Sequence, residues 1–203
     1  MTDPTATERR RSSIGARRSP ETEAAILSAA RELLAERGYA GFSIDEVARR
    51  AGAGKPTIYR WWPTKADLFI DVYSAEKAAH MALPETGALW SDILAYTRAL
   101  WGFWRETPSG RTFRALLAEA QTTDAALAAL REKFLPERLK DLRHMFERAA
   151  ARGEIAPEAV DDLLTLYIGF NWVHLLTDRL ADDPPAIARV ARLIAGTPAG
   201  EGR

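Results

Sequence analysis

Residues 43–65, SIDEVARRAGAGKPTIYRWWPTK, contain two short helical patterns separated by a break that is rich in glycine. Ser43 followed by Glu46 is the S-x-x-E pattern of a capping box, which begins a helix. Apolar residues then recur at helical spacing, at Ile44, Val47, Ala48 and Ala51. Gly52-Ala53-Gly54 favours a tight turn because glycine adopts turn conformations at low cost, and Pro56 is tolerated in the first turn of the next helix. The stretch therefore predicts a helix-turn-helix.

The second of these helices displays side chains that suit a DNA duplex, with Ile58 as its inward anchor. The first turn of a recognition helix enters the major groove, and flanking polar groups hold phosphates. Lysine and arginine donate to guanine, and apolar carbons contact the thymine methyl group. We expect base contacts from Lys55, Pro56, Thr57 and Arg60, and phosphate contacts from Tyr59, Trp61 and Lys65. Taken alone, the pattern also allows a purely structural helix pair with Trp61 and Trp62 in the core.

Three motifs extend the helix-turn-helix pattern to neighbouring residues on both sides. They are T-x3-I-x2-A-A-x2-L-x4-G from residue 22, S-I-x2-V-A-x2-A-G from residue 43, and K-P-T-I-Y-x-W-W-P-T-K-x2-L from residue 55. Over residues 22–70 the sequence resembles the DNA-binding domain of the tetracycline-repressor (TetR) family of bacterial regulators. The resemblance implies the same base and phosphate contacts and adds Ser43, at a helix start that faces phosphate. Asp45 departs from the pattern, because some members carry a basic residue there, and we expect no DNA contact from its carboxylate.

Composition narrows the function classes. The chain has no cysteine, which excludes disulfides, a thiolate nucleophile and zinc–thiolate sites. Its net charge of zero divides into +4 over residues 1–65 (12 Lys and Arg against 8 Asp and Glu) and −4 over the remainder. A basic head on an acidic body fits a small nucleic-acid-binding domain joined to a larger one. The sequence has no apolar run long enough for a secretory signal or a membrane span, so we expect a cytoplasmic protein. The resemblance implies that it is bacterial and associated with the nucleoid.

The chain divides into successive segments. Residues 1–18, with five arginines and no apolar pattern, predict a disordered basic arm that is either a solvated tail or an additional DNA contact. Residues 19–65 form the expected DNA-binding domain, and a linking helix over residues 64–81 leads out of it. Residues 82–197 form the expected ligand-binding and dimerisation domain. Residues 198–203 predict a disordered tail.

No strand pattern appears after Glu85, so we expect an all-α fold of about nine helices. An aromatic stripe ends at Pro108-Ser109-Gly110, and a shorter helix is expected to start at Thr112. Residues 127–146 predict one helix that Gly153 closes. The last two helices begin near Pro157 and Ile187.

Large aromatic residues are abundant in the body, and most are expected to be core. The functional interpretation is a mostly apolar pocket for a small-molecule effector, with a few polar groups that fix its orientation. Asn171 interrupts the apolar run YIGFNWVHLL and needs a hydrogen-bond partner, from protein or ligand. The candidate pocket residues are Trp101, Trp104, Phe113, Gln121, Tyr167, Asn171 and His174.

The run from Asp161 to Leu180 is apolar on more than one face, which is typical of a helix buried on both sides. Together with the last helix, over about residues 158–196, it predicts a homodimer held by a four-helix bundle, as the resemblance also implies. A twofold dimer suits a palindromic DNA operator, because half-sites repeat at about one helical turn, roughly 34–36 Å.

Catalytic motifs are missing from the sequence. The three histidines lack a partner at i+4, no G-x-S-x-G or G-x-G-x-x-G occurs, and Pro56 stands where a phosphate loop requires serine or threonine. We expect no enzyme activity, no metal and no cofactor. The predicted function is a dimeric transcriptional regulator, a repressor that a small, largely hydrophobic ligand releases from its operator. A helical enzyme, and a DNA-binding activator or organiser that responds to no ligand, stay open as alternatives.

Overall fold

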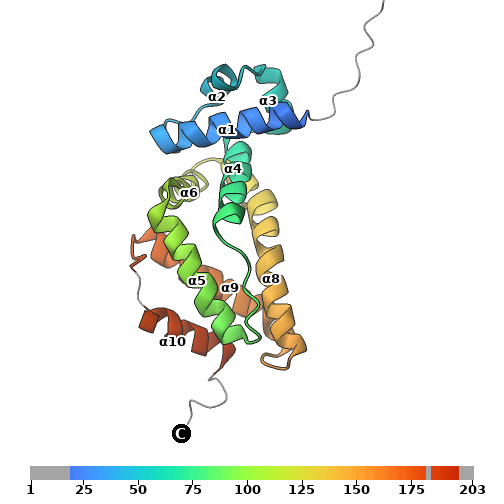
Figure 1. Ribbon diagram of the computed structural model, residues 1–203, viewed down its shortest axis with the longest axis vertical. Helices are drawn as coiled ribbons and strands as arrows, with labels where there is room; N and C mark the ends of the chain where they lie inside the picture. Colours follow the sequence, from blue (N-terminus) through green and yellow to red (C-terminus); the bar gives the residue numbers. More distant parts are fainter. Residues whose placement is uncertain (1–18, 182–183, 197–203) are drawn as a thin grey trace, which may run out of the picture.

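The computed structural model describes residues 19–181 and 184–196, and all regular structure within them is helical (Figure 1). With α7, η1 and α8 counted as one continuous helix, and η2 counted with α9, these residues form nine helices, so the all-α prediction is confirmed. The expected basic arm and C-terminal tail lie outside the described residues. The elements are α1 (Pro20–Arg37), α2 (Ile44–Ala51), α3 (Lys55–Trp61), α4 (Lys65–His80), α5 (Leu89–Glu106), α6 (Pro108–Glu119), α7 (Asp124–Ala129), η1 (Leu130–Phe134), α8 (Leu135–Ala151), η2 (Pro157–Ala159), α9 (Val160–Leu176) and α10 (Pro184–Ala195).

Helices α1–α3 form a head at one end of the molecule, and α4 leads from it into a body built from α5–α10 (Figure 1). The start of α2 follows the sequence prediction only in part. Ser43 Oγ accepts a hydrogen bond from Glu46 N at 3.3 Å, but the Glu46 carboxylate turns to the Arg49 and Arg50 guanidinium groups instead of completing the capping box. Charge-assisted hydrogen bonds are stronger than a bond to a neutral backbone N–H, which accounts for the difference.

The turn between α2 and α3 requires glycine at its first position. Gly52 has φ of 61° and lies in the left-handed region that other residues rarely adopt. Ile58 then enters the core with no exposed surface and fixes one face of α3 against the head. The sequence prediction of helix, turn and helix is confirmed at each of these positions.

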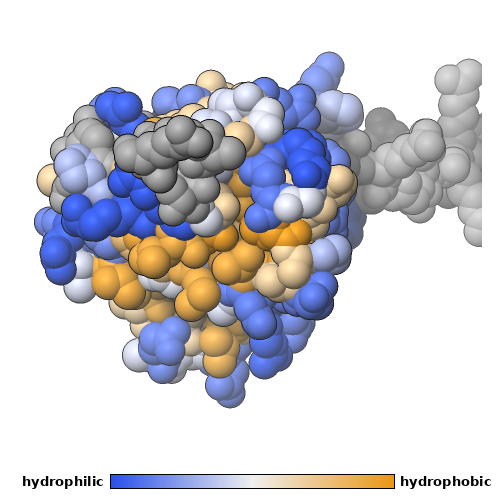
Figure 2. All heavy atoms as spheres, turned by 90° about the horizontal axis from the view of Figure 1, so that it is seen from below, coloured by the Kyte–Doolittle hydropathy of each residue, from blue (hydrophilic) through white to orange (hydrophobic). Residues whose placement is uncertain are grey.

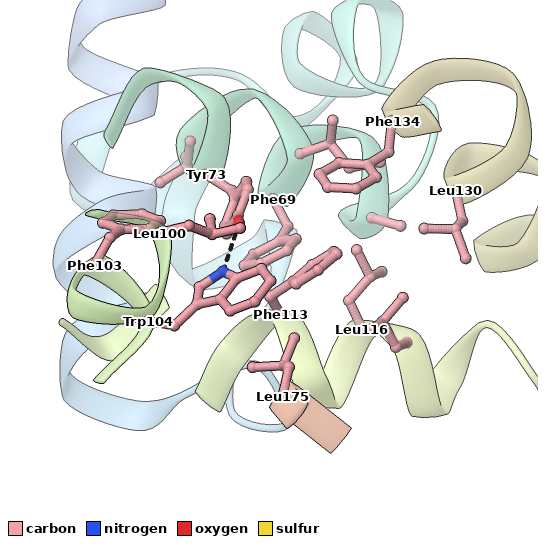
Figure 3. Close-up of a cluster of buried hydrophobic side chains, with 14 of the residues drawn as sticks. Phe69, Tyr73, Leu100, Phe103, Trp104, Phe113, Leu116, Leu130, Phe134 and Leu175 are labelled. Atoms are coloured by element: carbon pink, nitrogen blue, oxygen red, sulfur yellow. Dashed lines mark hydrogen bonds between the residues drawn. The ribbon is translucent and has the colours of Figure 1, made fainter. Parts of the chain in front are cut away.

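Helix α4 belongs to both parts of the molecule. It starts with a complete capping box between Thr64 and Asp67. On the following turns, Phe69 and Tyr73 enter an aromatic cluster of the body, where Tyr73 Oη accepts a hydrogen bond from Trp104 Nε1 at 2.7 Å (Figure 3). A rigid helix therefore ties the head to the centre of the body.

The corner between α5 and α6 differs from the sequence prediction. Residues 108–110 were expected to form a break, but α6 already begins at Pro108, with Thr107 Oγ1 accepting a hydrogen bond from Ser109 N at 3.2 Å. Gly110 serves a close contact between the two helices, because a Cβ at this position would lie 2.1 Å from the Trp104 carbonyl oxygen. Proline at the first helical position is favourable, and the glycine is needed for packing instead of a turn.

The predicted helix over residues 127–146 is present, but it widens into a π segment at η1. Pro136 is the second residue after this segment and has no N–H to continue the α-helical ladder, so a local change in hydrogen bonding is expected just before it. The widened turn brings Phe134 into the aromatic cluster, next to Tyr73 and Phe113. The last helix, α10, packs mainly against α5 and less closely against α9.

Candidate nucleic-acid interface

Helix α3 is anchored from its inner side. Trp62, directly after α3, is fully buried, and its Nε1 donates a hydrogen bond to Asp71 Oδ2 of α4 at 2.6 Å. Trp61 is half-buried and stacks edge-on against Trp62, with ring centres 5.7 Å apart. These contacts fix the orientation of α3 relative to the helix that enters the body.

The opposite side of α3 faces solvent. Of the expected base-contacting residues, Lys55, Pro56 and Arg60 are exposed and Thr57 is half-buried. The structure therefore brings these four residues together on one short helix. Of the expected phosphate-contacting residues, Ser43 and Tyr59 are exposed, while Trp61 and Lys65 are half-buried.

Lys55 has a partner that the sequence did not reveal. Its Nζ lies 2.7 Å from Asp45 Oδ2 of α2, and both side chains are more than half exposed. Exposed ion pairs contribute little to stability, so the contact orients Lys55 without holding it strongly. Asp45, from which no DNA contact was expected, thus acts on the position of an expected base-contacting side chain.

An ion-pair network fixes α2 on α1. Arg50 bridges the two helices, since it binds Glu36 at 2.6 Å and Glu46 at 3.1 Å. Hydrogen bonds from Arg49 and Arg50 lower the pKa of Glu46 to about 2. The sequence analysis did not single out this network, because it joins residues from two helices whose packing had to be known first.

Lys65 points away from the outer surface of the head. Its Nζ lies 2.8 Å from Glu119 Oε2 at the end of α6 and 4.4 Å from the centre of the Tyr39 ring. Tyr39 Oη donates to Glu119 Oε1 at 3.4 Å, and burial together with the Glu119 charge raises the pKa of Tyr39. We call Tyr39, Lys65 and Glu119 the head–body latch, because Glu119 belongs to the body and its two partners lie on the head side.

The expected pocket residues of the body divide into two groups. Trp104, Phe113, Tyr167 and Asn171 surround one cavity of about 20 Å³, which has room for about one water molecule. Trp101, Gln121 and His174 do not line it.

Each residue outside this cavity has an intramolecular contact instead. Trp101 Nε1 donates to Asn171 Oδ1 at 2.9 Å, and His174 stacks on Trp101. The exposed Gln121 side chain donates through Nε2 to the Leu117 carbonyl oxygen at 3.4 Å. The hydrogen-bond partner predicted for Asn171 is therefore a protein group, the indole of Trp101.

A larger cavity of about 480 Å³ lies beside the small one, between α4, α5, η1 and α8. Lys77, Tyr96 and Arg138 are among its polar lining residues, none of which the sequence singled out. Lysine and arginine on amphipathic helices resemble ordinary surface residues, so no sequence signal distinguished them. Among the described residues, no cluster of three or more histidine, aspartate or glutamate side chains could hold a metal ion.

Two family profiles match the chain over these same segments. Residues 26–72 match the profile described as "Bacterial regulatory proteins, tetR family", and residues 83–194 match "Tetracyclin repressor-like, C-terminal domain". The chain belongs to the TetR family. The first TetR match spans most of α1 through the first half of α4, and the second spans the body, so the helix-turn-helix described above lies in the family's regulatory domain. The chain is a DNA-binding transcriptional regulator of the helix-turn-helix type.

Individual TetR-family proteins are similar over most of the chain. The HTH-type transcriptional regulator YdeS of Bacillus subtilis is 30% identical over 141 residues, which cover 70% of this chain and 71% of YdeS. The DNA-binding transcriptional repressor TetR of Mycobacteroides abscessus is 33% identical over 162 residues, 79% of this chain and 84% of that protein. The crystal structure of the TetR-family regulator SCO0332 superposes with a TM-score of 0.76 at 31% identity, covering 87% of this chain and 98% of that one.

The comparisons support the TetR-family expectation for both halves of the chain, and the relatives are regulators of transcription, not enzymes. None of the helices in residues 19–181 and 184–196 combines the length and the apolar composition that crossing a membrane demands.

Proposed function

We propose that this TetR-family chain is a dimeric repressor in the bacterial cytoplasm, where it binds a palindromic operator on the chromosome. A small molecule that enters the body releases it from that operator. The observation that carries the proposal is the outward face of α3, on which Lys55, Pro56 and Arg60 are exposed, while Ile58 and Trp62 on the inner side are buried. A helix anchored from behind with donors in front is suited to the major groove.

The dimer is proposed from a stripe on α9. Leu166, Gly169, Val173 and Leu176 repeat at spacings of three and four residues, and all four are exposed. Leu166 is 64% exposed and Val173 is 55% exposed. Such a repeat of apolar residues is the seam along which two helices pack, and Gly169 has open space around it that would allow close approach.

Helix α10 also exposes an apolar side chain, Leu193, which is 81% exposed. Figure 2 looks at the molecule from the end opposite the head and shows hydrophobic residues gathered between hydrophilic borders. Exposed apolar patches of this kind mark interaction surfaces in soluble proteins. We propose that a second copy of the chain covers α9 and α10.

Light scattering tests the dimer. We expect a dimer at micromolar concentration for the wild type and a monomer for Leu166→Glu. Leu127→Glu is the matched control, because Leu127 is an exposed leucine on α7, away from the stripe. A monomeric wild type, or equal effects of the two substitutions, would refute the proposed interface.

A random-sequence DNA selection tests operator binding. The selected sites should be palindromic, with half-site centres about 34–36 Å apart along the duplex. Selection of single, unpaired half-sites would contradict dimeric recognition, and failure to enrich any sequence would contradict the proposed function.

Ligand response is proposed from the continuity of α4. This helix begins at the head, carries Tyr73 into the aromatic cluster (Figure 3) and lines the larger cavity with Lys77. A ligand that binds one position of α4 better than another shifts the population of head orientations. A screen for compounds that release the selected operator provides the test, and a compound bound in the body that leaves operator affinity unchanged would argue against this coupling.

A further inference from the structure

The larger cavity of the body carries positive charge in an unusual arrangement. Lys77 of α4 and Arg138 of α8 both lie over the ring of Tyr96, with Nζ and Cζ at 5.7 Å and 5.5 Å from its centre. Two cations therefore face one aromatic ring inside a cavity of about 480 Å³. Cation–π contacts lessen the cost of this arrangement, but they supply no hydrogen-bond acceptor.

Hydrogen-bond donors in this cavity are left without acceptors. Tyr96 is only 2% exposed, and neither its Oη nor the buried Nη1 of Arg138 has a hydrogen-bond partner within the described chain. No described carboxylate oxygen lies within 4.0 Å of Lys77 Nζ. Buried polar groups are nearly always hydrogen-bonded in native structures, so these donors indicate a missing acceptor.

The carboxylates around the cavity do not fill this role. Asp71 is engaged by Lys133 at 3.0 Å and by Trp62. Glu137 and Asp141 are exposed at the rim of the cavity, and neither forms an ion pair with Lys77 or Arg138 within the described chain.

The electrostatic consequence appears at Lys77. Burial, together with the neighbouring Arg138 charge, lowers the pKa of Lys77 to about 7, while Asp141 opposes the shift. The cation pair is therefore not neutralised by its surroundings, and an anion placed between the two side chains would relieve their repulsion.

We propose that the effector is an amphipathic acid whose carboxylate or other oxyanion binds Lys77 and Arg138 and accepts a hydrogen bond from Tyr96 Oη. Its apolar part would extend toward Tyr73 and Phe134, which line both this cavity and the small aromatic one beside it. This inference rests on the proposed ligand response, and it replaces the largely hydrophobic effector expected from the sequence with one that carries a negative charge. Arginine and lysine are the side chains that bind such groups.

A matched pair of fluorescent probes tests the charge requirement without DNA. 8-Anilinonaphthalene-1-sulfonate carries an oxyanion, and N-phenyl-1-naphthylamine has the same aromatic skeleton without it. We expect the wild type to bind the sulfonate at least about tenfold more tightly, and Arg138→Met or Lys77→Met to remove most of that preference. Affinity for the neutral probe should change less than about twofold, since no charge is involved.

Lys140→Met is the control, because Lys140 lies on the solvent side of the same helix as Arg138. Thermal melting shows whether each variant is folded. If Arg138→Met or Lys77→Met is unstable, the other variant alone is enough for the test. Equal affinities of the wild type for the two probes would overturn the inference. So would a sulfonate preference that both Arg138→Met and Lys77→Met retain.

The outcome is separable from the proposed function. Release of the operator by neutral compounds alone would refute the acidic effector and leave the ligand-responsive repressor intact. Charge-dependent probe binding in a protein that never releases DNA would refute ligand response while retaining the anion site.

Discussion

Substitution of Glu119 by glutamine should make the protein bind DNA more tightly. Lys65 is expected at a phosphate, yet its Nζ lies 2.8 Å from Glu119 Oε2 in the head–body latch. DNA binding must therefore withdraw Lys65 from Glu119, or lose the contribution of Lys65. Glu119→Gln removes the competing charge and leaves a side chain of the same size, which cannot form an ion pair.

The magnitude follows from the exposure of the pair. The side chains of Lys65 and Glu119 are 31% and 28% exposed, so the pair is screened by solvent and its net contribution is about 1 kcal/mol. Two protomers bound to one operator would recover about 2 kcal/mol, which corresponds to roughly 30-fold tighter binding at low salt. If the wild-type complex instead leaves Lys65 on Glu119, the variant gains two phosphate contacts per dimer, which would steepen the dependence of log K on log salt by about 1.8.

Fluorescence anisotropy of the operator across a salt series measures both quantities. Glu85→Gln is the control, because Glu85 pairs with Arg148 at 3.1 Å within the body. In the Lys65→Met background, Glu119→Gln should have no further effect on DNA affinity, since the two residues act as one pair. Unchanged affinity and unchanged salt slope for Glu119→Gln alone would refute the competition between glutamate and phosphate.

Three further predictions concern stability. Gly110→Ala should lower the unfolding free energy by more than about 2 kcal/mol in chemical denaturation, because its Cβ would meet the Trp104 carbonyl oxygen at 2.1 Å; a near-neutral effect would contradict the close helix contact. Trp62→Phe should lower the unfolding free energy by about 1–3 kcal/mol, because it leaves Asp71 Oδ2 without its hydrogen-bond donor. It should also weaken operator binding, and an unchanged melting temperature would contradict this prediction. The pKa of Glu46 in the folded state, about 2, lies below its ordinary value of 4.5. The stabilising effect of the Glu46 carboxylate is therefore complete above about pH 4.5 and is lost as the pH falls toward 2. Glu46→Gln should weaken the dependence of the melting temperature on acid pH, and a profile identical to that of the wild type would contradict the prediction.

Features that depend on neighbouring residues in the chain could be predicted from the sequence. Ser43 and Thr64 cap their helices, and Gly52 takes the left-handed turn, because each of these roles needs only the next few residues. Gly110 shows the limit of such reasoning. A glycine after a proline indicates a break by local rules, whereas its actual role depends on the approach of α5, which the sequence does not reveal.

Pairings between distant segments could not be predicted. The contact of Lys65 with Glu119 depends on how the head sits on α6. The cavity around Lys77 and Arg138 depends on how α4, α5, η1 and α8 come together, which local sequence patterns do not specify. The outward residues of α3 were identified from the sequence because a short amphipathic helix has only one face to bury, although their contacts with DNA stay a prediction.

The most direct test of the central claim is the ratio of operator affinity to scrambled-DNA affinity, measured by anisotropy at one fixed salt concentration for the wild type, Lys55→Ala and Arg60→Ala. If α3 reads bases, the wild type should prefer its operator by about 10³-fold or more. Each substitution should then reduce that ratio by roughly 10- to 100-fold, since a good bidentate base contact contributes about 1–3 kcal/mol. Lys140→Ala should leave the ratio unchanged. An operator preference that both α3 substitutions leave intact would contradict the assignment of α3 as the recognition helix.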